Sequence, residues 1–488
     1  MTVSSNSRFI ILGAGMSGIL AAIKLRMAGH TDIAVYEKSD RIGGTWRDNS
    51  YPGLSCDVPA HAYTYEFAPN PEWSGYFAPG PEVQAYFEKV VADFQVMPII
   101  NFNAEIIRCT WRDVSGDWQV ETADGRIAEA EFIIAATGVL HHPKIPDIAG
   151  LDDFKGVKFH SARWDHKVPL EGKKIGVIGN GSTGVQLVTA LAKRGLDVVH
   201  FQRSPQWIMP VVQFAYTEAE KAVFRQSRAA IDAIRYDSVY FGNIQRFTKG
   251  VIDIDSPMMK EIEDYCLMNL EQSVRDPGLR EKLRPTYRAA CKRLIYSPDY
   301  YEAAQRPNLA TITSGIDKVL PGGIRDKDGA VHDLDLIALC TGFHSDRFVR
   351  PINVEGRRGA TLESAWKERC NGYYAISIPD FPNFFMLNGP TSPVGNFSLI
   401  DIAERQWAYI EQLISRVADD NARGIAATAT ALADYEDRRI TAAKATIFGS
   451  GCTSWYLDAH GIPITWPWDY DTFAQVMAKP DFEAFEVI

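Results

Sequence analysis

Two glycine-rich turns supply residue types suited to binding dinucleotides, and each is followed by a strand that ends on a charged side chain. The first turn, Gly13-Ala14-Gly15-Met16-Ser17-Gly18, lies between the apolar run Phe9–Leu12 and a segment with apolar residues at helical spacing. Its three glycines permit a tight turn, close approach of a pyrophosphate, and close packing of helix on strand. The following strand, from Asp32, ends on Glu37, where a carboxylate can bind a pair of ribose hydroxyls. This first unit favours FAD.

The second turn, Gly179-Asn180-Gly181-Ser182-Thr183-Gly184, follows the apolar strand from Lys174 to Ile178 and precedes a helix that runs to about Lys193. Its second strand, from Val198 to Gln202, is followed by Arg203 where the first unit has Glu37. A carboxylate repels a 2′-phosphate, whereas a guanidinium can bind it with two hydrogen bonds. The second unit therefore favours NADPH over NADH, unless Arg203 merely caps an exposed strand end.

Two longer motifs are more specific than either turn. Residues 43–57 begin Gly-Gly-Thr-Trp, pass through a Tyr-Pro-Gly corner and end on Asp57. The segment from Phe154 to Asp165 fits F-x-G-x-x-x-H-x-x-x-W-[PD], with these residues at the fixed positions: Phe154, Gly156, His160, Trp164 and Asp165. Together the motifs resemble those of type I Baeyer–Villiger monooxygenases, a class B flavin-dependent monooxygenase family. The resemblance covers essentially the whole chain, from Phe9 to Leu457.

The resemblance implies an NADPH- and O₂-dependent flavoprotein that converts ketones to esters or lactones through a C4a-peroxyflavin, with some sulfoxidation. Such chemistry requires a cation to keep the peroxide anionic, a carboxylate to hold that cation, and exclusion of water. The alternatives are an N- or S-oxygenating flavin monooxygenase and an uncoupled NADPH oxidase. A disulfide reductase and a non-catalytic nucleotide-binding regulator are less favoured. Trp164 argues against N- or S-oxygenation, because those relatives usually carry another aromatic residue there.

The segment Cys291-Lys292-Arg293-Leu294 resembles the family segment that carries the active-site arginine. The resemblance assigns that role to Arg293, with Asp57 as the carboxylate that positions it beside the flavin. Arginine suits the task because its guanidinium is planar and permanently charged. Without the resemblance, Arg293 reads as a solvated charge in a basic stretch, and Asp57 as a plain turn carboxylate.

Further residues are assigned to cofactor binding from the turns and the resemblance. Lys292 matches a lysine that reaches the 2′-phosphate, and Trp455 matches a tryptophan that closes over NADP, although an isolated aromatic residue is more often part of a core. The full predicted cofactor set is Gly13, Gly15, Ser17, Gly18, Glu37, Gly44, Thr45, Trp46, Asp57, Tyr63, Gly179, Gly181, Ser182, Thr183, Gly184, Arg203, Ser204, Lys292 and Trp455. His160 lies between the two units, in a linker; it is interpreted as a packed spacer that influences domain motion, without acting as a base.

The loop Gly389-Pro390-Thr391-Ser392-Pro393 also matches a family segment at the flavin. The residues that follow, from Val394 to Leu399, depart from the commoner family pattern. Because substrate-facing residues are expected there, the identity of the ketone and the position of oxygen insertion stay open.

These residues require an α/β fold with two Rossmann-like dinucleotide-binding domains. The strands near residues 131–138 and 335–342 each end in Thr-Gly and should complete the two sheets. Residues 211–290 lack the alternation of strands and are rich in helix formers, which predicts a helical insertion in the NADP domain. The expected parts are an FAD-binding domain at 1–141 and 348–488, an NADP-binding domain at 142–212 and 291–347, and the insertion at 213–290.

Composition limits the remaining possibilities. The chain has 488 residues, and its net charge of −10 makes nucleic acid an unlikely partner. No run of eighteen apolar residues is present, and the N-terminus lacks the layout of a signal peptide, so the expectation is a cytoplasmic protein without a membrane span. The seven cysteines are odd in number and scattered, which indicates a reducing compartment and no metal site. The oligomeric state stays open.

Overall fold

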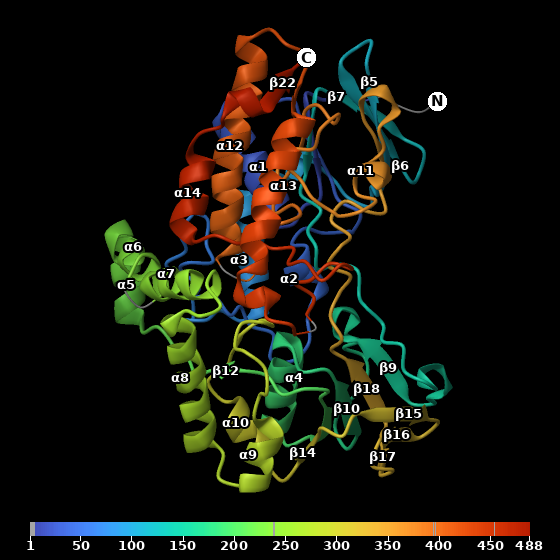
Figure 1. Cartoon of the computed structure of the whole chain (residues 1–488), viewed down its shortest axis with the longest axis vertical. Coiled ribbons are helices and arrows are strands. Elements are labelled where there is room, and N and C mark those ends of the chain that lie inside the picture. The colour runs from blue at the N-terminus through green and yellow to red at the C-terminus, as the bar shows by residue number, and fades with distance from the viewer. Residues whose placement is uncertain (1–4, 238–239, 394, 396, 453) are drawn as a thin grey trace.

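The computed structural model describes residues 5–237, 240–393, 395, 397–452 and 454–488, and it is built around two five-stranded parallel sheets. In Figure 1 the first sheet lies in the upper half of the elongated molecule and the second in the lower half. The predicted α/β class with two Rossmann-like cores is confirmed.

The first sheet has the strand order β20-β8-β2-β3-β4. These strands comprise Phe384–Met386, Phe132–Ala135, Phe9–Leu12, Ile33–Tyr36 and Ile100–Asn101. Strand β2 is buried along its whole length, as a parallel strand covered on both faces requires. Helix α1 (Met16–Met27) packs on this sheet, and Gly29 after it has φ +87°, the left-handed conformation that commonly follows a helix end.

The second sheet has the strand order β14-β11-β10-β18-β9. These strands comprise Leu309–Ile312, Asp197–Phe201, Lys174–Ile178, Leu336–Leu339 and Val157–His160. Helix α4 (Ser182–Lys193) follows β10, as predicted, and α10 (Tyr300–Ala304) packs against α4. Strand β9 corrects one expectation: the histidine motif does not lie in a free linker, because Val157–His160 pairs with β18 and forms the sheet edge.

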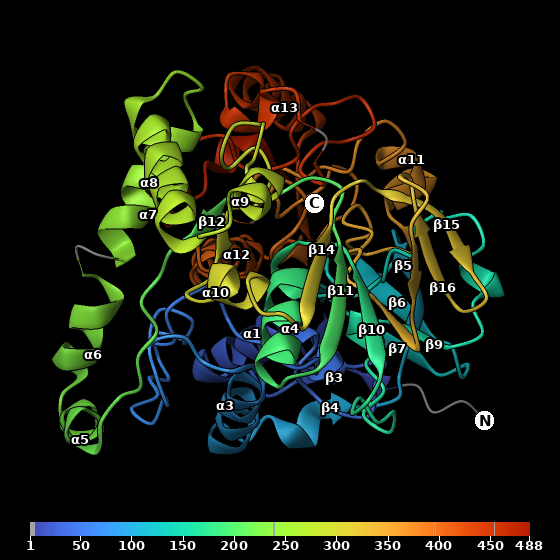
Figure 2. The ribbon, with the colours of Figure 1, turned by 90° about the horizontal axis from the view of Figure 1, so that it is seen from below.

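The predicted helical segment is present. Five helices fill it: α5 (Glu218–Gln226), α6 (Arg228–Arg235), α7 (Tyr240–Val251), α8 (Pro257–Ser273) and α9 (Pro277–Leu283). Figure 2 shows α5 to α8 as a column along one side of the molecule. The short strands β12 (Ile208–Met209) and β13 (Ile295–Tyr296) pair at the two ends of this segment, so it leaves and rejoins the fold at one place.

Smaller elements cover the two sheets. A third sheet of order β1-β7-β6-β5-β19 contains Ser5–Asn6, Ile127–Ala130, Asp117–Thr122, Ile106–Arg112 and Asn353–Glu355. Two further sheets contain β15 (Ile316–Leu320), β16 (Gly323–Asp326) and β17 (Val331–Asp333), and β21 (Ile425–Ala427) with β22 (Phe485–Val487). The remaining helices are α2 (Thr45–Asp48), α3 (Gly80–Asp93), α11 (Leu362–Ala365), α12 (Leu399–Asp419), α13 (Ala429–Lys444) and α14 (Tyr470–Ala478). Within the described residues, no helix combines the length and apolar character needed to cross a membrane.

Two connecting segments join the halves and lie side by side. The amide of Lys144 donates to the Gly342 carbonyl at 2.9 Å, and the amide of His344 donates to the His142 carbonyl at 2.9 Å. The imidazole Nε2 of His142 also lies 3.2 Å from the Arg350 carbonyl. The chain therefore leaves the first sheet and returns to it along one paired ribbon.

Candidate functional site

The first glycine turn has the geometry that a pyrophosphate requires. Gly13 has φ +101°, and a side chain at Gly18 would overlap the Gly13 carbonyl. Helix α1 starts at Gly15 without a capping side chain and without an acidic residue in its first turn. Its free amides and positive end therefore face the turn, which suits a bound phosphate. The loop at Gly44 lies against this turn, since a Cβ built on Gly15 comes within 3.6 Å of the Gly44 Cα.

Glu37 lies at the first turn, as predicted, but its carboxylate has partners within the protein. One oxygen accepts from the Ala14 amide at 2.9 Å. The other accepts from the Ser39 amide at 2.9 Å and from Arg47 at 3.0 Å. The side chains of Glu37 and Arg47 are only 5% and 6% exposed, so this ion pair fixes the carboxylate beside the glycines. Sequence reasoning missed Arg47, although it lies inside the residue 43–57 motif.

The second turn has the same form. Gly179 has φ +107°, and a Cβ built on Gly181 meets nothing within 4 Å, so open space lies beside it. Helix α4 likewise starts without a capping side chain or an acidic first turn. The hydroxyl of Ser182 is buried without a hydrogen-bond partner in the described structure. A phosphate at this helix end would supply the missing acceptor.

Two cations gather next to the second turn. Lys292 donates to the Ser204 hydroxyl at 2.8 Å, and its Nζ lies 4.3 Å from the centre of the Tyr287 ring. Burial, together with the nearby charge of Arg203, lowers the pKa of Lys292. Neither Arg203 nor Lys292 forms an ion pair with a carboxylate of the described residues. Two close cations without a carboxylate make a site for a dianion.

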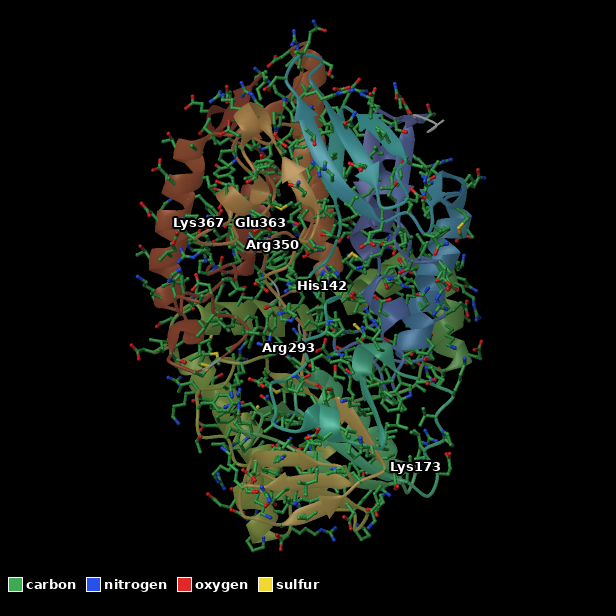
Figure 3. The ribbon with its side chains drawn as sticks, turned by 90° about the vertical axis from the view of Figure 1, so that its right-hand side faces the viewer. His142, Lys173, Arg293, Arg350, Glu363 and Lys367 are labelled. Carbon is green, nitrogen blue, oxygen red and sulfur yellow. A yellow bond between two sulfur atoms is a disulfide. The ribbon has the colours of Figure 1, made fainter. Side chains whose placement is uncertain are left out.

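Arg293 and Asp57 meet across the molecule although their positions are 236 apart in the sequence. Nη2 of Arg293 lies 2.7 Å from Oδ2 of Asp57, and Nε lies 3.2 Å from the same oxygen. Their side chains are 31% and 16% exposed. The Asp57 charge raises the pKa of Arg293 above its ordinary value. Figure 3 labels Arg293 near the middle of the long axis, where the ribbons of the two halves meet.

Aromatic side chains lie on the same loop as Asp57. The indole of Trp46 donates to the Tyr63 hydroxyl at 3.1 Å, and the two rings meet edge to face with centres 5.6 Å apart. Tyr63 is buried, which raises its pKa. The Tyr-Pro-Gly corner before Asp57 packs on α4: the Tyr51 hydroxyl donates to Gln186 at 2.8 Å, and Gln186 donates to the Ser55 carbonyl at 2.9 Å. These contacts fix the position of the loop that carries Asp57 relative to α4 and the second turn.

The histidine motif anchors the second sheet to the connecting ribbon. Nδ1 of His160 accepts from the Ala162 amide at 3.1 Å, so its Nε2 carries the proton and donates to the Gly342 carbonyl at 3.0 Å. Burial lowers the pKa of His160, which favours this neutral form. Trp164 is buried and packs edge to face on Phe159, and a side chain at Gly156 would overlap the Asp335 carbonyl.

The remaining motif residues have local roles. Phe154 is buried at 5% exposure, and Asp165 accepts from the Lys167 amide at 2.9 Å. Ser392 of the Gly389–Pro393 loop accepts from Gln406 at 3.2 Å. Val394 and Asn396, within the segment expected to face substrate, lie outside the described residues.

Near Arg293, the sequence predicted no role for Tyr456, Cys291 or Cys452. The predicted cofactor residue Trp455 is 38% exposed and stacks on Tyr456 with ring centres 4.1 Å apart. The Tyr456 hydroxyl approaches Arg293, and Cys291 forms a disulfide with Cys452. Two of the scattered cysteines therefore form a pair that the sequence analysis did not predict. The sequence separation of 161 between the two cysteines explains why spacing gave no sign of the pair.

Comparisons with known proteins agree with this arrangement. Residues 6–219 match the model of the flavin-binding monooxygenase-like family. An uncharacterized monooxygenase of Mycobacterium tuberculosis is 43% identical over 94% of this chain and 91% of its own. The Baeyer–Villiger monooxygenase of Streptomyces coelicolor is 36% identical over 100% of this chain and 93% of its own. The closed crystal structure of cyclohexanone monooxygenase has a TM-score of 0.87 and 27% identity, and the match covers 100% of both chains.

Proposed function

The chain belongs to the Baeyer–Villiger monooxygenase family, and on this premise we propose that Arg293 and Asp57 form its catalytic centre. The protein is an FAD- and NADPH-dependent monooxygenase that uses O₂ to oxidise a ketone to an ester or lactone. The observation that carries the proposal is the Arg293–Asp57 ion pair, which the fold assembles between the two dinucleotide turns from distant parts of the chain.

The first half of the molecule would hold FAD. Its pyrophosphate fits the uncapped start of α1, at the turn that contains Gly13, Gly15, Ser17 and Gly18, and its ribose fits the Glu37 carboxylate. Gly44, Thr45, Trp46 and Tyr63 would line the flavin ring. When bound, the flavin supplies the redox chemistry, taking a hydride from NADPH and activating O₂. The proposed FAD domain comprises residues 1–141 and 348–488.

The second half would hold NADPH. Its pyrophosphate fits the start of α4 at Gly179, Gly181, Ser182, Thr183 and Gly184. Its 2′-phosphate fits the cation pair of Arg203 and Lys292 beside Ser204. Trp455 is exposed at the edge of this site and would cover the nicotinamide. The proposed NADP domain comprises residues 142–212 and 291–347, with the helical insertion at 213–290.

Arg293 would stabilise the negative charge that develops on oxygen during the transfer. Its guanidinium stays protonated at any working pH, because Asp57 raises its pKa still further. Asp57 binds through one oxygen to Nε and Nη2 and does not bind Nη1. Half-buried Trp46 and buried Tyr63 would limit the access of water from the Asp57 loop. The carboxylate orients the cation, and the cation performs the electrostatic work.

Substitution of Arg293 tests this role. Arg293→Ala should bind FAD and still oxidise NADPH, but form ester at a rate lowered about a hundredfold or more and release hydrogen peroxide. Asp57→Ala should change the same quantities less, because the cation remains and is only displaced. Arg293→Lys should recover little, since an ammonium lacks the planar fork. Ester yield, NADPH consumption and peroxide are measured together on a panel of ketones.

Arg284 provides the matched control, because it lies in the same basic stretch but pairs with Glu271 near the surface. Arg284→Ala should keep the ester yield of the wild type. Near-normal ester yield from Arg293→Ala would refute the catalytic assignment. An N- or S-oxygenating enzyme would leave every ketone unconverted while oxidising amines or thioethers, and an oxidase would convert neither.

We also propose some sulfoxidation of thioethers at the same site, because the charge that Arg293 stabilises does not depend on the acceptor.

The supply of NADPH favours a location in the cytoplasm, which cell fractionation would test. The net charge of −10 argues against a nucleic-acid partner, because nucleic acid is also negatively charged.

A further inference from the structure

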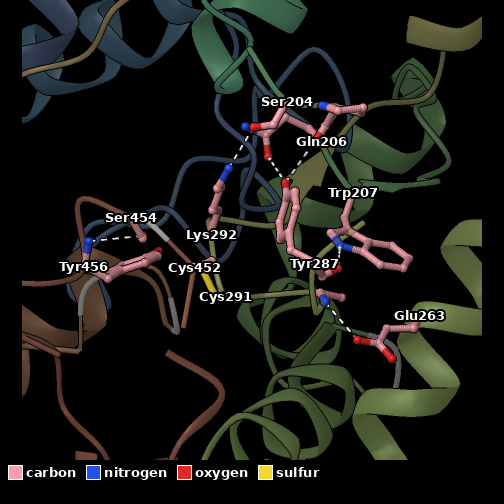
Figure 4. The surroundings of a disulfide bond; sticks show 12 residues. Ser204, Gln206, Trp207, Glu263, Tyr287, Cys291, Lys292, Cys452, Ser454 and Tyr456 are labelled. Atoms are coloured by element: carbon pink, nitrogen blue, oxygen red, sulfur yellow. Dashed lines mark hydrogen bonds between the residues drawn. A yellow bond between two sulfur atoms is a disulfide. The ribbon is translucent and has the colours of Figure 1, made fainter. Parts of the chain in front are cut away.

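The Cys291–Cys452 disulfide joins the catalytic segment to the C-terminal loop. Cys291 is buried and directly precedes Lys292 and Arg293, whereas Cys452 is half-buried and precedes Trp455 and Tyr456. Their Cα atoms lie 6.2 Å apart, within the range that a disulfide spans. Figure 4 shows the disulfide between the segment that carries Lys292 and the loop that carries Tyr456.

The Tyr456 hydroxyl lies close to the guanidinium of Arg293. A side chain on Gly395 would overlap the Tyr456 hydroxyl and would come within 3.4 Å of Nη1 of Arg293, so both groups face the same glycine. Tyr456 is buried, which raises its pKa, and the adjacent guanidinium of Arg293 partly offsets that rise. The phenol therefore lies beside the guanidinium on its Nη1 side, while Asp57 holds it at Nε and Nη2.

Few other bonds hold the loop before Tyr456. Across the described residues 451, 452, 454 and 455, the links to other segments are the disulfide and a 3.5 Å hydrogen bond from Ser345 to the Trp455 carbonyl. After Tyr456, the chain is fixed by the Ile464 amide, which donates to the Tyr456 carbonyl at 2.8 Å. The disulfide is thus the main link on the N-terminal side of the stacked Trp455–Tyr456 pair.

We propose that the Cys291–Cys452 disulfide is a redox-controlled tether that positions Tyr456 against Arg293. Reduction frees the loop, loosens the arginine and raises the fraction of NADPH lost as hydrogen peroxide. This inference rests on the proposed role of Arg293. Uncoupling releases hydrogen peroxide, and this peroxide re-oxidises Cys291 and Cys452 to the disulfide. The re-formed disulfide then lowers the uncoupling.

The redox steps balance with reagents of known class. A dithiol reduces the bond: its thiolate attacks the sulfur of Cys452, the more exposed partner, and expels the Cys291 thiolate. The second thiol then resolves the mixed disulfide, so the protein gains two electrons and two protons. In reverse, the Cys452 thiolate attacks hydrogen peroxide to give a sulfenic acid and hydroxide. The Cys291 thiol displaces water from that sulfenic acid to re-form the disulfide.

The state of the bond is tested first, without any assay of activity. The purified holoenzyme is treated with dithiothreitol or with hydrogen peroxide, desalted, alkylated and mapped by peptide mass spectrometry. We expect Cys291 and Cys452 as a linked peptide after peroxide and as two alkylated peptides after dithiothreitol. Hydrogen exchange of peptides from residues 447–460 should be faster in the reduced form. Two alkylated peptides after peroxide, or equal exchange in both forms, would overturn the proposal.

Coupling is then compared between the two forms. Reduction should raise peroxide released per NADPH by about three- to tenfold, the range that corresponds to the net contribution of one ordinary hydrogen bond. Cys452→Ser should match the reduced wild type and ignore dithiothreitol. Tyr456→Phe should release more peroxide even when oxidised, with little further change on reduction. Equal coupling in the oxidised and reduced wild type would overturn the proposal.

Cys370 provides the control, since it is a free and partly exposed cysteine. Cys370→Ser should keep the full response to dithiothreitol, and a response that persists in Cys452→Ser would assign the effect to another thiol and overturn the tether. Failure of the proposed function is distinguishable: the oxidised wild type would then convert no ketone, whereas the tether fails when conversion is normal and indifferent to the redox state.

Discussion

At the scale of single residues, we expect the charge at the end of the second strand of each unit to determine which cofactor that unit binds. Glu37 is buried with Arg47 and bonded to the first turn, whereas Arg203 is exposed beside Lys292 and has no carboxylate partner among the described residues. The charge of Glu37 is already neutralised by Arg47, whereas the charges of Arg203 and Lys292 have no anion beside them among the described residues. Only the second therefore gains electrostatically from a phosphate.

Arg203→Ala should accordingly raise KM for NADPH by about tenfold or more and leave KM for NADH almost unchanged. The lost contact involves only the 2′-phosphate, which NADH lacks. Steady-state kinetics with both cofactors provide the measurement. Arg194→Ala, an exposed arginine paired with Glu171 in the same half, should change neither value. Equal losses for both cofactors would contradict the assignment.

The two turns could be predicted from the sequence because each is a continuous motif whose glycine spacing is typical of dinucleotide binding. The pairing of Arg293 with Asp57 was predictable only through the family resemblance, since no local pattern connects positions 236 apart. Tyr456 and the Cys291–Cys452 bond were missed for the same reason: nothing near either cysteine specifies its partner. Arg47 was missed because a motif shows which residues occur together, not which of them pair.

At the scale of elements, the edge strand β9 changes the meaning of the histidine motif. The segment was interpreted as a linker because it lies between the two turns and because the family motif that it matches joins the domains. Its apolar positions instead pack on the second sheet, and His160 reaches the Gly342 carbonyl where the connecting ribbon begins. A strand of four residues is too short for alternation to distinguish it from a loop.

His160→Ala should keep FAD bound and flavin reduction measurable, yet lower oxygenation, because the ribbon loses its fixed contact with the sheet. Absorbance of bound flavin, stopped-flow reduction and ester yield measure the three properties separately. His166→Ala is the control, since that histidine is exposed and bonds only to Ser50. Outright loss of FAD from His160→Ala would show that the motif is needed for folding.

At the scale of the whole molecule, a buried ion pair clamps the helical insertion to the first half. Arg235 of α6 lies 3.4 Å from Glu404 of α12, and both side chains are at most 10% exposed. Burial raises the pKa of Glu404 to about 7, although Arg235 acts in the opposite direction. Desolvation therefore outweighs the attraction, and the folded protein holds a proton here that the unfolded chain releases near its ordinary pKa of 4.5.

The sign follows from that proton. The contribution of Glu404 to stability is complete below pH 4.5 and is lost as the pH rises to 7, by up to about 3 kcal/mol. Glu404→Gln should therefore match the wild type in Tm at pH 5 and exceed it at pH 8, as measured by calorimetry. Glu411→Gln, at an exposed position of the same helix, should show no such difference between the two pH values. A larger advantage of Glu404→Gln at pH 5 would contradict the argument.

The paired connecting ribbon has a consequence for biosynthesis. Every strand of the second sheet lies between residues 157 and 339, so that sheet can close while the ribosome is still adding the C-terminal third. The first sheet cannot, because β20 at Phe384–Met386 is its last strand and covers the free edge of β8. The half that contains β2 and β8 thus finishes folding after the second sheet, and its apolar strand β8 must stay unaggregated until the chain returns. Chaperones should bind nascent chains of this enzyme between the emergence of β8 and that of β20.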